Sequence, residues 1–180
     1  MTKAGKTTLK AIIFSLLGII GLIVLVLVGY VIYLSCTFYR IEDNQTLEVT
    51  NNQTSQVQLG EEYSLTTYNI GFGAYTHDFS FFMDSGEMLN GTKTQGSGSR
   101  AKDKQTVLDN TIGATLEILA LDTDFAFFQE VDTNSDRSFH VNQYEMLQNA
   151  FEGFSSSFAS NFHSGYLFYP ITNPHGAVNS

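Results

Sequence analysis

Two polar residues, Asn69 and Glu130, lie near the ends of segments whose composition is typical of β-strands. A carboxylate such as that of Glu130 is an oxygen ligand of the kind that Mg²⁺ prefers. An amide beside it, such as that of Asn69, can hydrogen-bond a phosphate or a metal-bound water. An ordinary solvent-facing strand end is the alternative for Glu130, and spacing alone favours that alternative. The two residues form one candidate site only if the fold brings them together.

Two predicted strands and a helix would position this pair. Residues 63–70 alternate and are rich in β-forming residues, and residues 125–131 are mostly apolar, so both are expected to be strands. Between them lies the stripe of an amphipathic helix: Val107, Leu108, Thr111, Ile112, Thr115, Leu116 and Leu119. A strand, a helix and a strand in this order favour a right-handed crossover between parallel strands. The side-chain ends of Asn69 and Glu130 should then lie about 4–8 Å apart.

The remaining elements are less regular. Residues 84–98 are rich in glycine, serine and other polar residues, and are expected to form a flexible loop outside the sheet. A second helix is expected at about 142–151, and further strands at 155–159 and 166–169. The expected fold class is therefore α/β.

The N-terminal region is apolar over a length that fits a membrane. No charged residue occurs from Ala11 to Tyr39, and residues 11–34 are assigned to a single transmembrane helix. A helix over 11–33 would be about 34 Å long, slightly more than the hydrocarbon core of about 30 Å. Lysines precede it, so the positive-inside rule places residues 1–10 in the cytoplasm and the C-terminal domain outside the cell membrane. The polar residues 35–60 are expected to be a stalk.

A cleaved signal peptide is the main alternative for this segment. The apolar run is longer than a usual signal-peptide core, and bulky residues occupy positions 30–34, where small ones would guide cleavage. An uncleaved anchor is therefore favoured. Cys36 resembles a lipoprotein cleavage site only faintly, and a single cysteine excludes any intrachain disulfide.

The charge is divided between the two parts of the chain. Residues 1–39 carry three lysines and no acid, whereas residues 40–180 carry 18 acids against six bases. So acidic a domain argues against a nonspecific nucleic-acid binder, which needs basic contacts to phosphates. It is compatible with an enzyme whose bound cations supply the positive charge.

Two short motifs resemble the endonuclease/exonuclease/phosphatase superfamily. Residues 65–71, Leu-Thr-Thr-Tyr-Asn-Ile-Gly, resemble its opening strand motif, and residues 124–131, Asp-Phe-Ala-Phe-Phe-Gln-Glu-Val, resemble its second motif, a hydrophobic strand ending in Gln-Glu. The similarity extends to Ser180, and residues 40–43 after a membrane segment are similar to membrane-tethered bacterial members. By this resemblance Asn69 is the active-site asparagine and Glu130 the metal-ligating glutamate.

The resemblance implies a four-layer α/β sandwich, of which residues 61–180 would supply one mixed sheet with covering helices. It also implies hydrolysis of a phosphate ester, in nucleic acid or a lipid headgroup, by water that Mg²⁺ or Mn²⁺ activates. Asn69 and Glu130 would be catalytic, and Glu130 would hold the metal. Substrate-binding roles are weaker expectations, with ordinary loop positions as the alternative, for Arg137, His140 and His175.

The sequence departs from this family after Glu130. The family's terminal Ser-Asp-His, whose histidine is catalytic, does not occur among the 180 residues, and Asp132-Thr133-Asn134 is the only Asp-x-Asn after Glu130. Asp132-Thr133-Asn134 follows the glutamate immediately and is expected to be a loop. Residues 61–180 are therefore expected to be the N-terminal part of a truncated domain, inactive alone. The alternative is a membrane-tethered binding module with a degenerate, non-catalytic site.

The orientation of the membrane segment can be tested in intact cells. Protease added outside should digest residues after Arg40 and leave the N-terminal peptide in the membrane, because lysines precede an uncharged span. Protection of residues 41–180 would contradict this orientation. Release of a soluble part beginning near Thr37 would instead show a cleaved signal.

Overall fold

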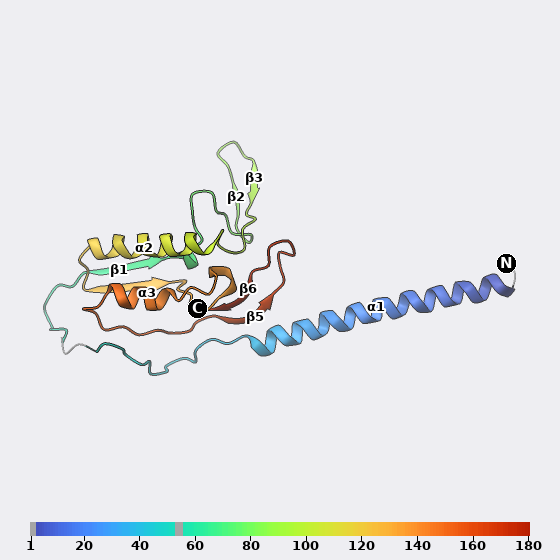
Figure 1. The fold of residues 1–180 in the computed structure, drawn as a ribbon, viewed down its shortest axis with the longest axis horizontal. Coiled ribbons are helices and arrows are strands. Elements are labelled where there is room, and N and C mark those ends of the chain that lie inside the picture. The colour runs from blue at the N-terminus through green and yellow to red at the C-terminus, as the bar shows by residue number, and fades with distance from the viewer. Residues whose placement is uncertain (1–2, 53–55) are drawn as a thin grey trace. The chain divides into compact units, whose positions relative to one another are not determined.

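The computed structural model describes residues 3–52 and 56–180 of the mixed α/β chain. The chain divides into two compact units, Met1–Thr37 and Phe38–Ser180, and each is described by itself. Figure 1 shows the second unit as helices beside short strands.

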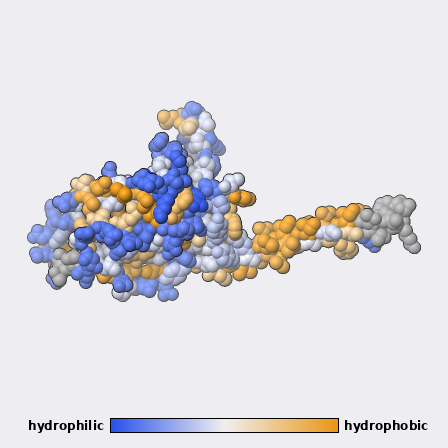
Figure 2. All heavy atoms as spheres, viewed as in Figure 1, coloured by the Kyte–Doolittle hydropathy of each residue, from blue (hydrophilic) through white to orange (hydrophobic). Residues whose placement is uncertain are grey.

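The first unit is one helix, α1 (Lys3–Thr37). Its apolar part, Leu9–Thr37, has 29 residues, which corresponds to about 43 Å of helix. It is long and apolar enough to cross a membrane, and its hydrophobic surface is visible in Figure 2. An N-terminal helix of this kind fits a membrane anchor and also a signal sequence.

The second unit is built around two parallel strands, β1 (Leu65–Asn69) and β4 (Phe125–Gln129). They pair in register from Leu65 with Phe125 to Asn69 with Gln129, as the order strand, helix, strand predicts. Hydrogen bonds join the residues just before the two strands, because the Asp124 carboxylate accepts from both the backbone N–H and the hydroxyl of Ser64, each at 2.7 Å.

The crossover between these strands is α2 (Lys104–Ala120), whose first turn is capped by Asp103 accepting from the Thr106 N–H at 2.8 Å. The predicted stripe is wrong in part, because Ile112, Leu116 and Leu119 are exposed. The packed face instead comprises Val107, Thr111, Ala114, Thr115 and Ile118. The two threonines can be buried because each hydroxyl donates to a backbone carbonyl one turn earlier.

The two α-helices described in this unit, α2 and α3 (Gln143–Ala150), pack on the same core. α3, close to the predicted range, begins at Asn142, whose side chain accepts from the Glu145 N–H. The core joins residues after β1 and β4 to both helices: Ile70, Ala114, Ile118, Val131, Leu147 and Phe151. Ala126 and Phe128 of β4 pack against it, so the helices cover the face of the sheet that these two residues occupy.

The prediction of one mixed sheet is wrong. The described residues form three two-stranded sheets: β1–β4, β2 (Ser85–Glu87) with β3 (Lys93–Gln95), and β5 (His163–Leu167) with β6 (Gly176–Asn179). The last two sheets are antiparallel. β6 does not extend the central ladder, because it meets the loop after β4 through single bonds such as Thr133 N–H to the Asn179 carbonyl, 3.0 Å.

Two local predictions also need correction. Residues 84–98 form the β2–β3 hairpin rather than an unstructured loop, and Gly91 has a φ of +82° in its turn, a conformation that favours glycine. Residues 155–159 form no strand, and the predicted strand at 166–169 overlaps only the end of β5.

Residues 38–51 are joined to a segment far along the chain. Tyr39 and His163 exchange backbone hydrogen bonds of 2.9 and 2.8 Å, and Thr50 and Ser156 exchange bonds of 2.8 and 3.0 Å. The Asn51 amide also donates to the Glu152 carbonyl at 2.6 Å. These contacts make the chain after Phe38 part of the second unit.

The face of the β1–β4 sheet that α2 and α3 do not cover is apolar, and we expect it to promote self-association. Phe127 is 53% exposed there, beside the exposed Leu65 and Phe125. We expect Phe127→Thr to reduce concentration-dependent self-association, measured by sedimentation in mild detergent, with little change in unfolding free energy. The control Leu147→Ala should leave association unchanged and destabilise the unit by about 2–5 kcal/mol. Equal association of Phe127→Thr and the parent chain would contradict this assignment.

Candidate functional site

The structure brings Asn69 and Glu130 into direct contact. The Asn69 amide nitrogen donates to Glu130 Oε1 at 2.9 Å, closer than the separation expected from strand spacing. The Asn69 carbonyl oxygen accepts from the Gly71 N–H at 2.8 Å. Both ends of the asparagine amide are therefore engaged, which fixes its orientation and aims its donor at the carboxylate.

The left-handed backbone of Glu130 explains this closeness. Asn69 pairs with Gln129, so in a regular strand the next residue would point to the opposite face of the sheet. Glu130 has a φ of +55°, which breaks that alternation. Its carbonyl accepts from the Phe72 N–H at 3.0 Å, so the turn after β1 holds the turn after β4. A non-glycine residue in this region is strained and persists only where surrounding contacts maintain it.

The turn after β1 is as tightly defined as the one after β4. It forms the short helix η1 (Gly71–Gly73), in which Phe72 is buried with a φ of +44°. Gly71 has a φ of +54°, and a Cβ atom there would overlap the Tyr75 ring. Glycine is therefore required for both its backbone angle and its lack of a side chain. This turn places the Tyr75 ring beside the Asn69–Glu130 pair.

A groove of about 570 Å³ lies beside the pair. Its wall includes three acids and no lysine or arginine: Asp109 and Glu117 come from α2, and Glu130 follows β4. Burial raises the pKa of Tyr75, which also lines the groove, and the charges of Asp84 and Glu130 raise it further. Such a wall attracts cations and repels an anion until a cation compensates the charge.

The groove fits a divalent cation in part. Mg²⁺ is commonly held by one or two carboxylates, with waters and phosphate oxygens completing its coordination. Glu130 supplies one carboxylate whose orientation is fixed by Asn69. Within residues 3–52 and 56–180, no three side chains of His, Cys, Asp or Glu are grouped so that they could hold an ion. Glu130 therefore fits one ligand of a divalent cation, and the described residues do not form a complete metal site by themselves.

Arg137 lies under this site instead of on the surface. It belongs to the short helix η2 (Asp136–Ser138) and is buried, as is Asp132. Its Nε and Nη2 donate to both carboxylate oxygens of Asp132 at 2.8–3.3 Å. Its guanidinium carbon lies 4.2 Å from the centre of the Phe72 ring. Arg137 therefore supports the turn that holds Glu130, and its charge is balanced by Asp132.

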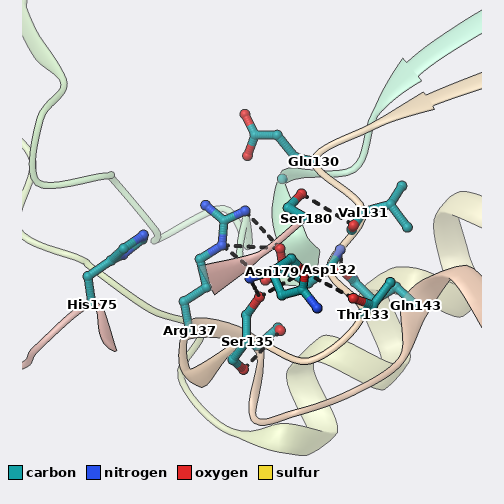
Figure 3. A network of polar contacts seen from close by, with 12 residues as sticks. Glu130, Val131, Asp132, Thr133, Ser135, Arg137, Gln143, His175, Asn179 and Ser180 are labelled. Carbon is teal, nitrogen blue, oxygen red and sulfur yellow. Dashed lines mark hydrogen bonds and ion pairs between the residues drawn. The ribbon is translucent and has the colours of Figure 1, made fainter. Parts of the chain in front are cut away.

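Figure 3 shows how this ion pair is tied to its surroundings. The Asp132 N–H donates to Gln143 Oε1 at 2.9 Å, and the Gln143 amide donates to the Thr111 hydroxyl at 2.7 Å. The Ser180 hydroxyl donates to the Val131 carbonyl at 3.2 Å. Residues 132–134 form a loop as predicted, whereas Val131 lies beyond β4 and not in the predicted strand. Loop 131–135 is thus linked to α2, α3 and the end of β6.

The two histidines lie outside the groove of Asn69 and Glu130. His140 is exposed, with its ring nitrogens 2.8 Å from the Asn134 amide oxygen and 3.2 Å from an Asp136 carboxylate oxygen. His175 is buried and hydrogen-bonded through Nδ1 to the Ser99 carbonyl, among the rings of Phe72, Phe81 and Phe82. The structure therefore unites Asn69 and Glu130, and it does not bring His140 or His175 to them.

Two acids of the groove escaped the sequence analysis. Asp109 and Glu117 are eight residues apart on α2, and Gly113 and Ala114 between them also line the groove. Their spacing is that of one helical face, so a polar stripe beside the apolar one was the available signal. The sequence around Asp109 and Glu117 did not indicate that this face of α2 would lie beside Asn69 and Glu130.

No protein family matches this chain, and comparisons with curated proteins and with solved structures give no match either. The case for a site at Asn69 and Glu130 therefore comes from their geometry and from the groove beside them.

Burial of His175 predicts an acid-sensitive fold. Burial lowers the pKa of its imidazole, the Arg137 charge lowers it further, and the Ser99 carbonyl and the Asp132 charge oppose the shift. The stabilising contribution is complete above the ordinary pKa of about 6.5 and is lost as the pH falls through the lower folded pKa. The loss should not exceed about 1.4 kcal/mol per pH unit.

Urea unfolding between pH 7.5 and 5 measures this contribution. We expect His175→Gln to flatten the pH dependence of the unfolding free energy relative to the parent chain. An identical pH dependence in the parent chain and His175→Gln would contradict the assignment.

Proposed function

We propose that this chain belongs to a membrane-anchored, extracytoplasmic, metal-dependent phosphoric ester hydrolase of the endonuclease/exonuclease/phosphatase superfamily. The observation that carries the proposal is the 2.9 Å hydrogen bond from Asn69 to Glu130 across two parallel neighbouring strands. Residue types at predicted strand ends and the motif resemblance both named these residues, and a direct contact between side chains 61 positions apart supports a shared site. Nucleic acid or a lipid headgroup is the proposed substrate class.

The exposed face of the central sheet supports the same fold family. Helices α2 and α3 cover one face of the β1–β4 sheet, while Phe125 and Phe127 remain exposed on the other. In a four-layer sandwich, the second face would meet another sheet through apolar residues of this kind. We therefore assign residues 61–180 to one half of such a sandwich.

The chemistry follows from what the residues of the groove can do. Glu130 would hold Mg²⁺ or Mn²⁺, which when bound neutralises charge on the phosphoryl oxygens of a substrate. Asn69 keeps the Glu130 carboxylate in one orientation through its amide donor. Asp109 and Glu117 attract the cation to the groove. The histidine that would transfer a proton in this family does not occur in a Ser-Asp-His context among these 180 residues.

The location of the enzyme rests on α1. The helix is long and apolar enough to cross a membrane, and the lysines before its apolar part favour a cytoplasmic N-terminus. We propose that it stays attached as a single-pass anchor, with residues 38–180 outside the cell membrane.

A membrane-tethered binding module is the second candidate function. The observation that favours it is the lack, within the part of the chain that the structure describes, of any three potential metal ligands grouped together. Such a module would keep the acidic groove and would bind a cationic or cation-bridged ligand without hydrolysis. Metal affinity and turnover, measured separately, distinguish the two functions.

Binding of Mn²⁺, followed by electron paramagnetic resonance on the full chain in detergent, tests the site. We expect Glu130→Gln to lower Mn²⁺ affinity about tenfold or more, because a charged oxygen ligand is lost while side-chain size is nearly kept. The matched change Glu117→Gln in the same groove should have a smaller effect. Asn69→Ala should also weaken binding less than Glu130→Gln does.

Turnover of a generic phosphodiester provides the second measurement. This chain should show none, because the described residues hold no group of three potential metal ligands and because neither His140 nor His175 lines the groove. In a longer form that turns over substrate, Asn69→Ala should reduce turnover more than it reduces metal affinity. Unchanged Mn²⁺ affinity in Glu130→Gln would contradict the proposed metal site.

A further inference from the structure

His175 joins segments of the second unit that lie far apart in the sequence. It is 4% exposed, and its Nδ1 is hydrogen-bonded to the Ser99 carbonyl oxygen. The Ser99 hydroxyl donates to the Asn173 carbonyl, which adds a second link between the same two segments. The imidazole also packs against the rings of Phe72 and Phe81, with centroids 6.3 and 5.7 Å away. His175 therefore connects the loop before β6 to the turn after β1 and to both sides of the β2–β3 hairpin.

The hydrogen bond to Ser99 determines which form of His175 this cluster accepts. A carbonyl oxygen can only accept, so Nδ1 carries the hydrogen and Nε2 is the nitrogen that acid protonates. Burial lowers the pKa of the imidazole, because the charged form would lose its hydration. The neutral ring is therefore the form that fits the closed cluster.

The charged groups around His175 would leave an imidazolium without a counter-ion. Arg137 of η2 and Asp132 of the loop after β4 both act on its pKa, and they already pair with each other at 2.8 Å (Figure 3). The Asp136 carboxylate of η2 accepts from the Ala177 N–H at 2.7 Å. The three segments that pack against the ring contain no ionisable side chain: residues 71–73, 79–82 and 97–99. A second buried cation beside Arg137 would be costly.

The cluster of His175 also holds the strained turn beside the candidate site. Phe72 is 1% exposed with a φ of +44°, and its N–H donates to the Glu130 carbonyl at 3.0 Å. Glu130 has a φ of +55°, and its carboxylate accepts from the Asn69 amide at 2.9 Å. Strained conformations of this kind persist only while surrounding contacts maintain them. Departure of His175 from the Phe72 ring would therefore loosen the turn that positions Glu130.

We infer that His175 is a pH-sensitive switch, whose protonation opens the aromatic cluster, releases the turn at Phe72 and lowers the affinity of Glu130 for a cation. The protonated ring moves towards water, because hydration supplies the stabilisation that a counter-ion would otherwise give. Phe72 then loses a contact that holds its left-handed backbone, and Glu130 loses its fixed orientation towards Asn69. The effect on cation affinity rests on the proposed function, whereas the effect on the turn does not.

Nuclear magnetic resonance of the full chain in detergent tests the switch as the pH is lowered from 7.5. The ring C–H signal of His175 gives the midpoint of its protonation, and hydrogen exchange of the Phe72 N–H reports opening of the turn. The N–H of Ile118, which lies in the other buried cluster, reports unfolding of the whole unit. His175→Gln is the control, because its side-chain amide can donate to the Ser99 carbonyl and stays neutral at every pH.

We expect the protection of the Phe72 N–H against exchange to fall below the His175 midpoint, by up to about tenfold per pH unit. The protection of Ile118 should stay unchanged, and His175→Gln should retain the protection of Phe72. Constant protection of Phe72 in the parent chain, or an equal loss in His175→Gln, would overturn the switch. An equal loss at Phe72 and Ile118 would show unfolding of the whole unit and would also overturn it. If His175→Gln does not fold, the comparison of Phe72 with Ile118 in the parent chain decides.

Mn²⁺ binding, measured by electron paramagnetic resonance, tests the link between the switch and the site. From pH 7.5 to one unit below the His175 midpoint, Mn²⁺ affinity should fall about fivefold more in the parent chain than in His175→Gln. Protonation of Glu130 itself contributes equally to both chains, so the difference between them measures the switch. Equal falls would overturn the link to the site. No Mn²⁺ binding by either chain at pH 7.5 would overturn the proposed function and this link together, and the protection of Phe72 would still decide whether the turn opens.

Discussion

Parallel pairing of β1 with β4 is the constraint on which the rest of the domain depends. Parallel neighbours cannot be joined by a tight turn, so the chain must cross over, and α2 is that crossover. The crossover covers one face of the sheet and brings both carboxyl ends to the same edge. Asn69 and Glu130 meet at that edge because of this topology, and the groove beside them is walled by the same helix.

A buried network of side chains holds two strained backbone conformations at the edge of the central sheet. Phe72 and Glu130 both have left-handed backbones, and a hydrogen bond from the Phe72 N–H to the Glu130 carbonyl joins them. Arg137 lies over the Phe72 ring and is paired with Asp132. An isolated buried arginine would be costly, so the pair and its hydrogen bonds are needed together. Arg137 is better understood as a support of the site than as a contact for substrate.

The sequence predicted the elements that have a strong period and missed those that depend on contacts. Alternation and an apolar run identified the two strands, and an amphipathic stripe identified α2, although some residues of that stripe are exposed. The β2–β3 hairpin was missed because glycine and serine around it suggested an irregular loop, although Asn90-Gly91 is a strong hairpin signal. The single mixed sheet was wrong because strand-like composition does not specify which edge a strand joins.

The site itself could be predicted only in part. Residue types and order proposed Asn69 and Glu130, but the reversal that turns Glu130 towards Asn69 depends on the Phe72 N–H from another segment. The pairing of Asp132 with Arg137 lies within a loop and follows no period. Loop 131–135 and helix η2 are shaped by their partners in β6 and α3, and local sequence carries little information about such partners.

The most direct test of the central claim observes the Asn69 side chain itself while a cation is added. In an amide-labelled chain, low concentrations of Mn²⁺ should broaden the nuclear magnetic resonance signals of the Asn69 side-chain amide group before those of Asn134 and Asn142. Glu130→Gln should abolish that preference. Uniform broadening of all three asparagines, or selective broadening that survives Glu130→Gln, would contradict a cation site formed by Glu130 and oriented by Asn69.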